Sequence, residues 1–422
     1  MMKKNEILSC LKGNKKISAY EVSIIDKDSR ELFYVLDHLE INRAVKVKTT
    51  AITVYVSDAK TTGSSSITVT AADDLKSLNT KINAAVKKAA SAKNPYYPLT
   101  AKTENIRNTK KGNQDLNEIA TKVAKAIFKA DVYKNGWINS TEIFVSSFKE
   151  EFINSNGVDH INDSFKIEVE CIPTWSNKKE EFELYKFYES NRFDSKAITE
   201  EIDDILKLAK ARSQALTLKD VKLPEDLPVL VKNDMLETIV RNLASDLNYR
   251  SLYMHQNHYN KKDVLSNTAF DMTMKAMIPG CAASRKFDSH GVVLKSVKLI
   301  DKGVVKNNYG DIQFGHYLDE KKISGNLPVC EIKAETMPYK KKPHLIIETF
   351  SAPQLESDSG YWGGEVRLAR YYDGKKYIPL TGFSIAGSLY EDLKSVGFSE
   401  EEAVQSRYKG PKYMIFKGIK IS

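Results

Sequence analysis

The sequence predicts an α+β protein with strand-rich N-terminal domains that each carry packing helices, followed by a larger β-dominated C-terminal domain. The first half of the chain runs twice through several alternating strands and then through one amphipathic helix. The regular strand–helix–strand alternation of a doubly wound parallel sheet is absent. At 422 residues the chain is longer than one hydrophobic core usually supports, so we expect domains at 1–100, 101–215 and 216–422.

The first domain begins with extended segments. Residues 19–25 alternate between polar and apolar side chains and predict a strand, and the polar stretch 26–30 predicts a turn. Further strands are expected up to residue 71. Asp73 or Asp74 is then expected to cap a helix over 75–92, in which apolar residues recur every three or four positions.

The second domain repeats this order after a polar linker at 100–113. An amphipathic helix is expected over 114–131, followed by four strands between residues 140 and 190. A second helix is expected over 195–211, where the isoleucine and leucine residues form one apolar stripe. The strands alternate as in antiparallel sheets, which predicts one solvated face and one packed face.

The third domain is richer in strands. A short strand is expected before a helix at 233–247, capped by Asn233 or Asp234. Two turns are predicted inside β-hairpins, at Asp301–Gly303 and at Asp373–Gly374. One short helix at 387–396 interrupts the strands near the end of the chain.

Composition limits the function classes. Sixty-four Lys and Arg residues against 55 Asp and Glu residues give a net charge of +9. The lysines are spread along the chain in short runs such as Lys110–Lys111, without a basic arm, so we do not expect nucleic-acid binding.

No apolar run approaches the ~20 residues of a membrane span, and the N-terminus has no apolar signal core. The four cysteines are far apart, as in reduced cytosolic proteins, so we expect a soluble, cytoplasmic protein.

The sequence contains none of the common catalytic motifs. Neither GxGxxG nor GxxxxGK[ST] nor GxSxG occurs. The serines at 64–66 have no neighbouring base, and Cys281 and Cys330 are expected to be buried thiols and not nucleophiles. The remaining single histidines are expected on the surface or hydrogen-bonded in the core, and they are His38, His160, His290, His316 and His344.

One histidine pair has the spacing of metal ligands. His255 and His258 are three residues apart and would share the face of a helix. The surrounding segment SLYMHQNHYNKKD is polar and loop-like, and no HExxH motif is present. An exposed polar loop is therefore the preferred interpretation, and a metal site at His255 and His258 is the alternative.

The order of the segments resembles the TldD/PmbA family. The resemblance is carried by VYVSDAKTTGSSSITV at 54–69, by EIFVSSFKEEFINSNGVDHINDSFKIEVEC at 142–171, and by two C-terminal blocks. These blocks are SRKFDSHGVVLKSVKLIDKGVVKNNYGD at 284–311 and GGEVRLARYYDGKKYIPLTGFSIAGSLYEDLKSV at 363–396. The similar segments occur in the family's order over residues 17–421.

This resemblance implies a link to zinc-dependent proteolysis. TldD-type chains of the family carry HExxxH on a helix and a late cysteine, whereas PmbA/TldE-type chains lack both. The segment that corresponds to the motif, NDMLETIVRN, has Leu236 and Arg241 in place of the histidines, and only Glu237 remains. No cysteine follows Cys330. We therefore expect no zinc or other cofactor and no catalytic residues in this chain.

The resemblance further implies a non-catalytic subunit of a metalloprotease system that binds and helps to process extended or unfolded peptides. Its expected partners are a TldD-type catalytic subunit or, in isolation, a second copy of the chain. Two other functions remain open: a regulator of DNA gyrase or of toxin–antitoxin partners, suggested by the family's older name, and an independent peptidase that uses a different site, such as His255 and His258.

The homodimer is expected through residues from 290 onward, because exposed strand edges favour pairing with another chain. The alternative is that the apolar positions of this region form an ordinary sandwich core within one chain. The positions concerned are Val366, Leu368, Tyr371, Tyr372, Tyr377 and Ile378.

Overall fold

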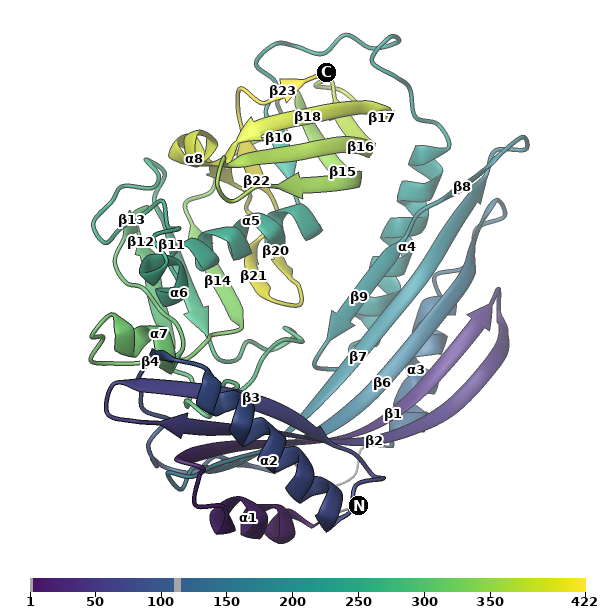
Figure 1. Ribbon diagram of the computed structural model, residues 1–422. Helices are drawn as coiled ribbons and strands as arrows, with labels where there is room; N and C mark the ends of the chain where they lie inside the picture. Colours follow the sequence, from purple (N-terminus) through teal and green to yellow (C-terminus); the bar gives the residue numbers. More distant parts are fainter. Residues whose placement is uncertain (1–2, 110–114) are drawn as a thin grey trace.

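The computed structural model describes residues 3–109 and 115–422. The last part of the expected linker at 100–113, the Lys110–Lys111 run and the expected start of the helix at 114 lie outside the described residues. Within the described residues, the strands form sheets of nine, eight and six members. The α+β class predicted from the sequence is confirmed. Figure 1 shows the nine-stranded sheet below and to the right of the two C-terminal sheets.

The nine-stranded sheet contains strands from both expected N-terminal domains. Its order is β4-β3-β2-β1-β6-β7-β5, with β8 and β9 also paired to β7. Because β1 pairs with β6 from Glu21 to Val35, residues before and after position 100 belong to one sheet. The domain limits near 100 and 215 stay predictions. The strands are β1 (Ala19–Val35), β2 (His38–Ser57), β3 (Thr61–Val69), β4 (Asn94–Pro95), β5 (Arg107–Asn108), β6 (Gly136–Asn154), β7 (Asp159–Ser176), β8 (Glu181–Glu183) and β9 (Lys186–Ser190).

The turn predicted at 26–30 is wrong, because β1 runs through this segment without interruption. The chain turns only at Leu36 and Asp37, where Leu36 has a φ of 55°. The polar residues are stabilised inside the sheet, since Asp28 lies 2.7 Å from Arg30 and 3.1 Å from Lys46 on the neighbouring strand. The charge of Asp28 is thus balanced within β1 by Arg30 and across the strands by Lys46, so this polar stretch does not end the strand.

Helices cover one face of this sheet in two groups. The helix α2 (Leu75–Ser91) packs on β2 and β3, and its predicted cap Asp74 accepts a hydrogen bond of 2.7 Å from the amide of Ser77. The helices α3 (Leu116–Phe128) and α4 (Ser195–Arg212) pack together on β6 and β7. An N-terminal helix that was not predicted, α1 (Lys4–Gly13), buries Ile7 and Leu11 in the core formed with α2.

The C-terminal region is built around α5 (Asn233–Asp246), which shares one apolar core with both smaller sheets. Both predicted hairpin turns are confirmed. The eight-stranded sheet contains β10 (Val229–Val231), β15 (His344–Leu355), β16 (Tyr361–Tyr372), β17 (Tyr377–Leu380), β18 (Phe383–Ser388), β19 (Gly397–Phe398), β22 (Met414–Phe416) and β23 (Lys420–Ile421). The six-stranded sheet contains β11 (Phe270–Lys275), β12 (Val297–Asp301), β13 (Val304–Val305), β14 (Val329–Ala334), β20 (Glu402–Val404) and β21 (Tyr408–Pro411). The short helices are α6 (Tyr249–Tyr253), α7 (Ile312–Tyr317) and α8 (Leu389–Asp392).

Two details of this region differ from the sequence prediction. The residue that caps α5 is Lys232, without a side-chain hydrogen bond, so neither Asn233 nor Asp234 is the cap. On β16, Val366 and Leu368 are fully buried within the chain itself. The sandwich-core alternative therefore holds for these two positions, and they cannot form a dimer interface. The homodimer through residues from 290 onward stays a prediction, and of the expected positions Tyr377 is 44% exposed.

Among the described residues, no helix combines the length and the apolar composition that crossing a bilayer demands. The longest described helix, α4, carries acidic and basic residues along its exposed side.

Candidate functional site

A groove of about 710 Å³ lies between the nine-stranded sheet and the C-terminal region. The sheet contributes residues of β6 and β7, and the opposite wall is the segment 277–286 that follows β11. Apolar and polar side chains are mixed along it. The lining residues are Asn108, Phe148, Glu150, Asn162, Asp163, Ser164, Phe165, Lys166, Asn191, Met277, Ile278, Pro279, Ala282, Ala283, Ser284, Arg285, Lys286, Pro328 and Arg407.

The segment 277–286 is held in place by hydrogen bonds to the end of β9. The side chain of Asn191 accepts a bond of 2.9 Å from the amide of Gly280 and donates one of 2.8 Å to the carbonyl of Cys281. Within the segment, the hydroxyl of Ser284 accepts from the amide of Ile278 and donates to its carbonyl, both at 3.0 Å. These bonds tie the wall segment to the end of β9 and stiffen it internally.

Three basic residues reach the groove from different parts of the C-terminal region. Arg285 and Lys286 follow one another on the wall segment, and Arg407 lies just before β21. The backbone amide of Arg407 donates to Oε2 of Glu237 at 3.4 Å, which links the groove to α5. The positive charge of the groove therefore comes from residues that are more than 100 positions apart in the sequence.

Glu237, the remnant of the family motif, lies beside this groove and is half-buried. Desolvation by burial raises the pKa of its carboxyl, although the nearby Arg407 and Arg241 act in the opposite direction. Leu236 is fully buried in the core, whereas Arg241 is exposed, so the two positions expected for histidines lie on different sides of α5.

A zinc site does not fit this helix. An apolar buried leucine and a permanently charged guanidinium offer no lone pair to a metal ion. Among the described residues, no group of three or more His, Cys, Asp or Glu side chains is placed to hold a metal. The expectation that the chain binds no cofactor stays a prediction.

The thiols of the C-terminal region are not activated. Burial raises the pKa of Cys281 to about 12, and the nearby charge of Glu237 acts in the same direction. Burial also raises the pKa of Cys330 strongly. Both thiols are buried, as the sequence predicted, and only a thiolate is a good nucleophile, so we expect them to be unreactive at neutral pH.

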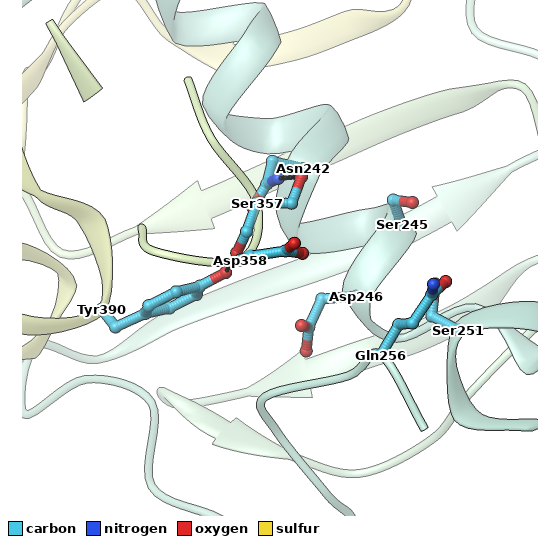
Figure 2. Close-up of a pocket in the computed structure, with 8 residues that line it drawn as sticks. All are labelled: Asn242, Ser245, Asp246, Ser251, Gln256, Ser357, Asp358 and Tyr390. Carbon is cyan, nitrogen blue, oxygen red and sulfur yellow. Dashed lines mark hydrogen bonds between the residues drawn. The ribbon is translucent and has the colours of Figure 1, made fainter. Parts of the chain in front are cut away.

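A second, smaller pocket of about 170 Å³ lies at the C-terminal end of α5 (Figure 2). Three of its lining residues are joined by hydrogen bonds. The side-chain amide of Asn242 donates to the hydroxyl of Ser357 at 2.7 Å, and the hydroxyl of Tyr390 donates to the carbonyl of Ser357. The carboxylate of Asp246 accepts two backbone amides. The pocket is lined by Asn242, Ser245, Asp246, Ser251, Gln256, Ser357, Asp358 and Tyr390. We assign it no role.

The predicted pair His255 and His258 lies in a loop, and the two side chains have different surroundings. Helix α6 ends at Tyr253, and His255 is exposed in a left-handed backbone conformation with a φ of 54°. His258 instead lies 3.0 Å from the carboxylate of Asp246 through Nδ1, and it stacks on Tyr390 with a centroid distance of 4.0 Å. The loop conformation expected for this segment is confirmed, and the absence of a metal there stays a prediction.

The single histidines follow the expected pattern. His160 is fully buried, and Nδ1 accepts from the amide of Ile106 while Nε2 lies 3.0 Å from the carbonyl of Gly291. His344 is also fully buried, with Nδ1 at 2.7 Å from the carbonyl of Lys342. Both imidazoles are hydrogen-bonded structural residues.

The sequence of the C-terminal region is similar to a known protein family. Residues 224–422 match the model of the PmbA/TldA metallopeptidase C-terminal domain. No curated protein matches the sequence.

Three solved structures share the fold over almost the whole chain. TldE from Thermococcus kodakarensis has a TM-score of 0.79 at 14% identity and covers 99% of this chain and 100% of its own. A putative modulator of a DNA gyrase from Thermotoga maritima has a TM-score of 0.79 at 12% identity, with 99% of each chain covered. A putative modulator of DNA gyrase from Bacteroides thetaiotaomicron has a TM-score of 0.78 at 14% identity, with 99% of this chain and 98% of that chain covered.

Proposed function

The chain belongs to the TldD/PmbA family, and from this we propose that it is a TldE-like, non-catalytic subunit that holds an unfolded peptide for a metal-dependent peptidase partner. The proposal rests mainly on the groove between the nine-stranded sheet and the segment 277–286. Its volume of about 710 Å³ lies within the range of ligand-binding clefts, about 300–1,000 Å³.

The lining of the groove suits an extended chain of mixed sequence. Phe148, Met277 and Pro279 offer apolar contacts, and Met277 is 49% exposed. The amide side chains of Asn108 and Asn162 lie beside them and bond each other at 2.8 Å. An unfolded peptide offers both apolar side chains and backbone amides, so such a surface binds it without requiring one sequence.

The residues near α5 support a role in binding and not in hydrolysis. The groove's nearest carboxylate on α5, Glu237, has Leu236 and Arg241 where a metallopeptidase of this family would have histidines. The Cys281 thiol nearby is held protonated by burial. Hydrolysis is therefore assigned to a TldD-type partner, and this chain contributes binding and positioning of the substrate.

Mixing the purified chain with the TldD-type subunit of its own organism tests this division of labour. Hydrolysis of an unfolded, casein-derived peptide should appear only when both chains are present. Ala283→Trp places an indole in the groove and should suppress this hydrolysis at least tenfold. The control Ala44→Trp, at an exposed position of β2, should leave it unchanged. Equal hydrolysis with and without this chain would contradict the proposal.

A further inference from the structure

We propose that the groove selects peptides that carry a carboxylate, which Arg285 and Arg407 bind. This inference rests on the proposed function and names the class of peptide. The carboxylate can belong to the C-terminus of the peptide or to an acidic side chain, because both present the same planar pair of oxygens. Guanidinium groups match this geometry with two parallel hydrogen bonds.

Arg285 is fixed by two hydrogen bonds to backbone carbonyls, and its guanidinium keeps N–H donors that no other group uses. Its backbone amide donates to the carbonyl of Ala276 at 2.9 Å, and Nη2 donates to the carbonyl of Asn326 at 3.2 Å. The third nitrogen, Nε, is buried and has no hydrogen-bond partner among the described residues. A buried donor without an acceptor costs stability, so this N–H indicates a group that arrives with the ligand.

The cations of the groove also differ in how their charge is balanced. Lys166 lies 2.8 Å from Glu168 and 2.7 Å from Glu189, so its charge is compensated. Among the described residues no carboxylate lies within salt-bridge distance of the side chain of Arg285, Lys286 or Arg407, although Glu150 interacts electrostatically with Arg285 and Glu237 with Arg407. Three cations on one wall without a direct salt bridge attract an anion.

Two carboxylates share the groove and limit this attraction. Glu150 and Asp163 belong to the sheet wall, opposite the arginines. Burial raises the pKa of Glu150, while Arg285 and a hydrogen bond from Asn162 act in the opposite direction. The positive side of the groove is therefore the wall of residues 285, 286 and 407, and the negative side is the sheet. A peptide carboxylate is therefore expected beside residues 285, 286 and 407.

Fluorescence anisotropy with three labelled peptides of one unfolded sequence tests the inference. The first peptide ends in a free carboxylate and has no acidic side chain, and the second is its C-terminal amide. The third is the same amide with one Gln replaced by Glu. The full-length chain should bind the first or the third about tenfold more tightly than the second, since one charge-assisted hydrogen-bonded pair accounts for such a factor. Which of the two is favoured identifies the source of the carboxylate.

Variants show whether the arginines cause the preference. Arg285→Gln and Arg407→Gln should each reduce the preference, measured as the ratio of the affinity for the carboxylate peptide to that for the neutral amide, at least threefold. The control Arg250→Gln removes an exposed guanidinium on α6 and should change neither value. Equal binding of all three peptides by the wild type would overturn the inference and leave the proposed function intact. Binding of none of them would contradict both.

Discussion

Nδ1 of His290 lies 3.3 Å from Oε1 of Glu21, and this contact joins the C-terminal region to the first strand of the nine-stranded sheet. Further hydrogen bonds hold the turn that contains His290 and Gly291. The hydroxyl of Thr100 donates to the carbonyl of His290 at 2.6 Å, and Nε2 of His160 lies 3.0 Å from the carbonyl of Gly291. The two parts of the chain that form the groove are therefore connected by a largely buried polar cluster.

Stability should depend on pH through this cluster. Burial alone would lower the pKa of His290, but the hydrogen bond and charge of Glu21, together with Asp288 and Asp311, raise it to about 9. A histidine titrates near 6.5 in an unfolded chain. Because the folded-state pKa is the higher one, the stabilisation is complete below about pH 6.5 and is lost as the pH rises through about 9.

Glu21→Gln removes the charge that His290 faces. The free energy of unfolding should fall by about 1–3 kcal/mol at pH 6 and by much less at pH 10, where the imidazole is neutral. Urea denaturation at the two pH values measures this difference. Glu40→Gln, at an exposed position of β2, is the matched control and should change stability little at either pH. If Glu21→Gln lowered the free energy of unfolding equally at pH 6 and pH 10, the raised pKa of His290 would be contradicted.

A buried ion triad stabilises the eight-stranded sheet. The side chain of Glu348 is fully buried between Lys232 and Arg370, and the attraction of these two cations lowers the pKa of its carboxyl despite desolvation. Glu348→Gln leaves two cations without their counter-ion and should cost about 3–5 kcal/mol in guanidinium unfolding. Glu391→Gln breaks an exposed pair with Lys394 and should cost less than about 1 kcal/mol. Similar losses for both variants would contradict the prediction.

Gly63 on β3 allows the C-terminal end of α2 to approach the sheet. A Cβ atom at this position would lie 1.9 Å from the carbonyl oxygen of Ala89 and 2.6 Å from that of Ala92. Gly63→Ala should therefore lower the free energy of unfolding by about 1–3 kcal/mol or more, because backbone atoms of the helix must move. Gly13→Ala, where a Cβ meets nothing within 4 Å, is the control and should not destabilise the protein. A thermal unfolding midpoint that is the same for both variants would disprove the close contact.

Cys10 should react with thiol reagents faster than the three buried cysteines. Burial raises the pKa of Cys171 and of Cys281 to about 12, and it also raises that of Cys330. Only Cys10 is partly exposed. A disulfide reagent at pH 8 should therefore modify one thiol rapidly in the native protein and four after denaturation, and Cys10→Ser should remove the rapid phase. Rapid modification of Cys281 in the folded chain would reopen the assignment of that thiol as inert.

Elements with a strong apolar stripe could be predicted from the sequence. The helix α2 lies close to its predicted range because its apolar spacing and its cap Asp74 point to the same start. The polar stretch 26–30 was predicted wrongly, because the partners of its charges, such as Lys46, come from another strand. Asn233 was expected as a cap from its residue type, whereas in the structure it lies inside α5 with a φ of 51°. The helix-capping propensity of a residue type alone does not determine where a helix begins.

The candidate groove could not be predicted from the sequence. Its arginines at 285 and 407 and its sheet residues at 148–166 lie in three separate segments, and no local spacing links them. The sequence did identify Glu237 and the inert Cys281, which lie beside the groove. The pairing of β6 with β7 forms the sheet wall, and the bonds of Asn191 and of the turn at His290 hold the C-terminal wall beside it.

Binding of an unfolded peptide to the purified chain, with the peptide analysed by mass spectrometry afterwards, tests the central claim most directly. The wild type should bind a labelled unfolded peptide at micromolar concentrations and return it uncut after hours of incubation. Ala283→Trp, which fills the groove, should weaken this binding at least tenfold, whereas Ala44→Trp should not. Cleavage of the peptide by the chain alone, or equal binding by the wild type and Ala283→Trp, would contradict a non-catalytic subunit that holds peptides in this groove.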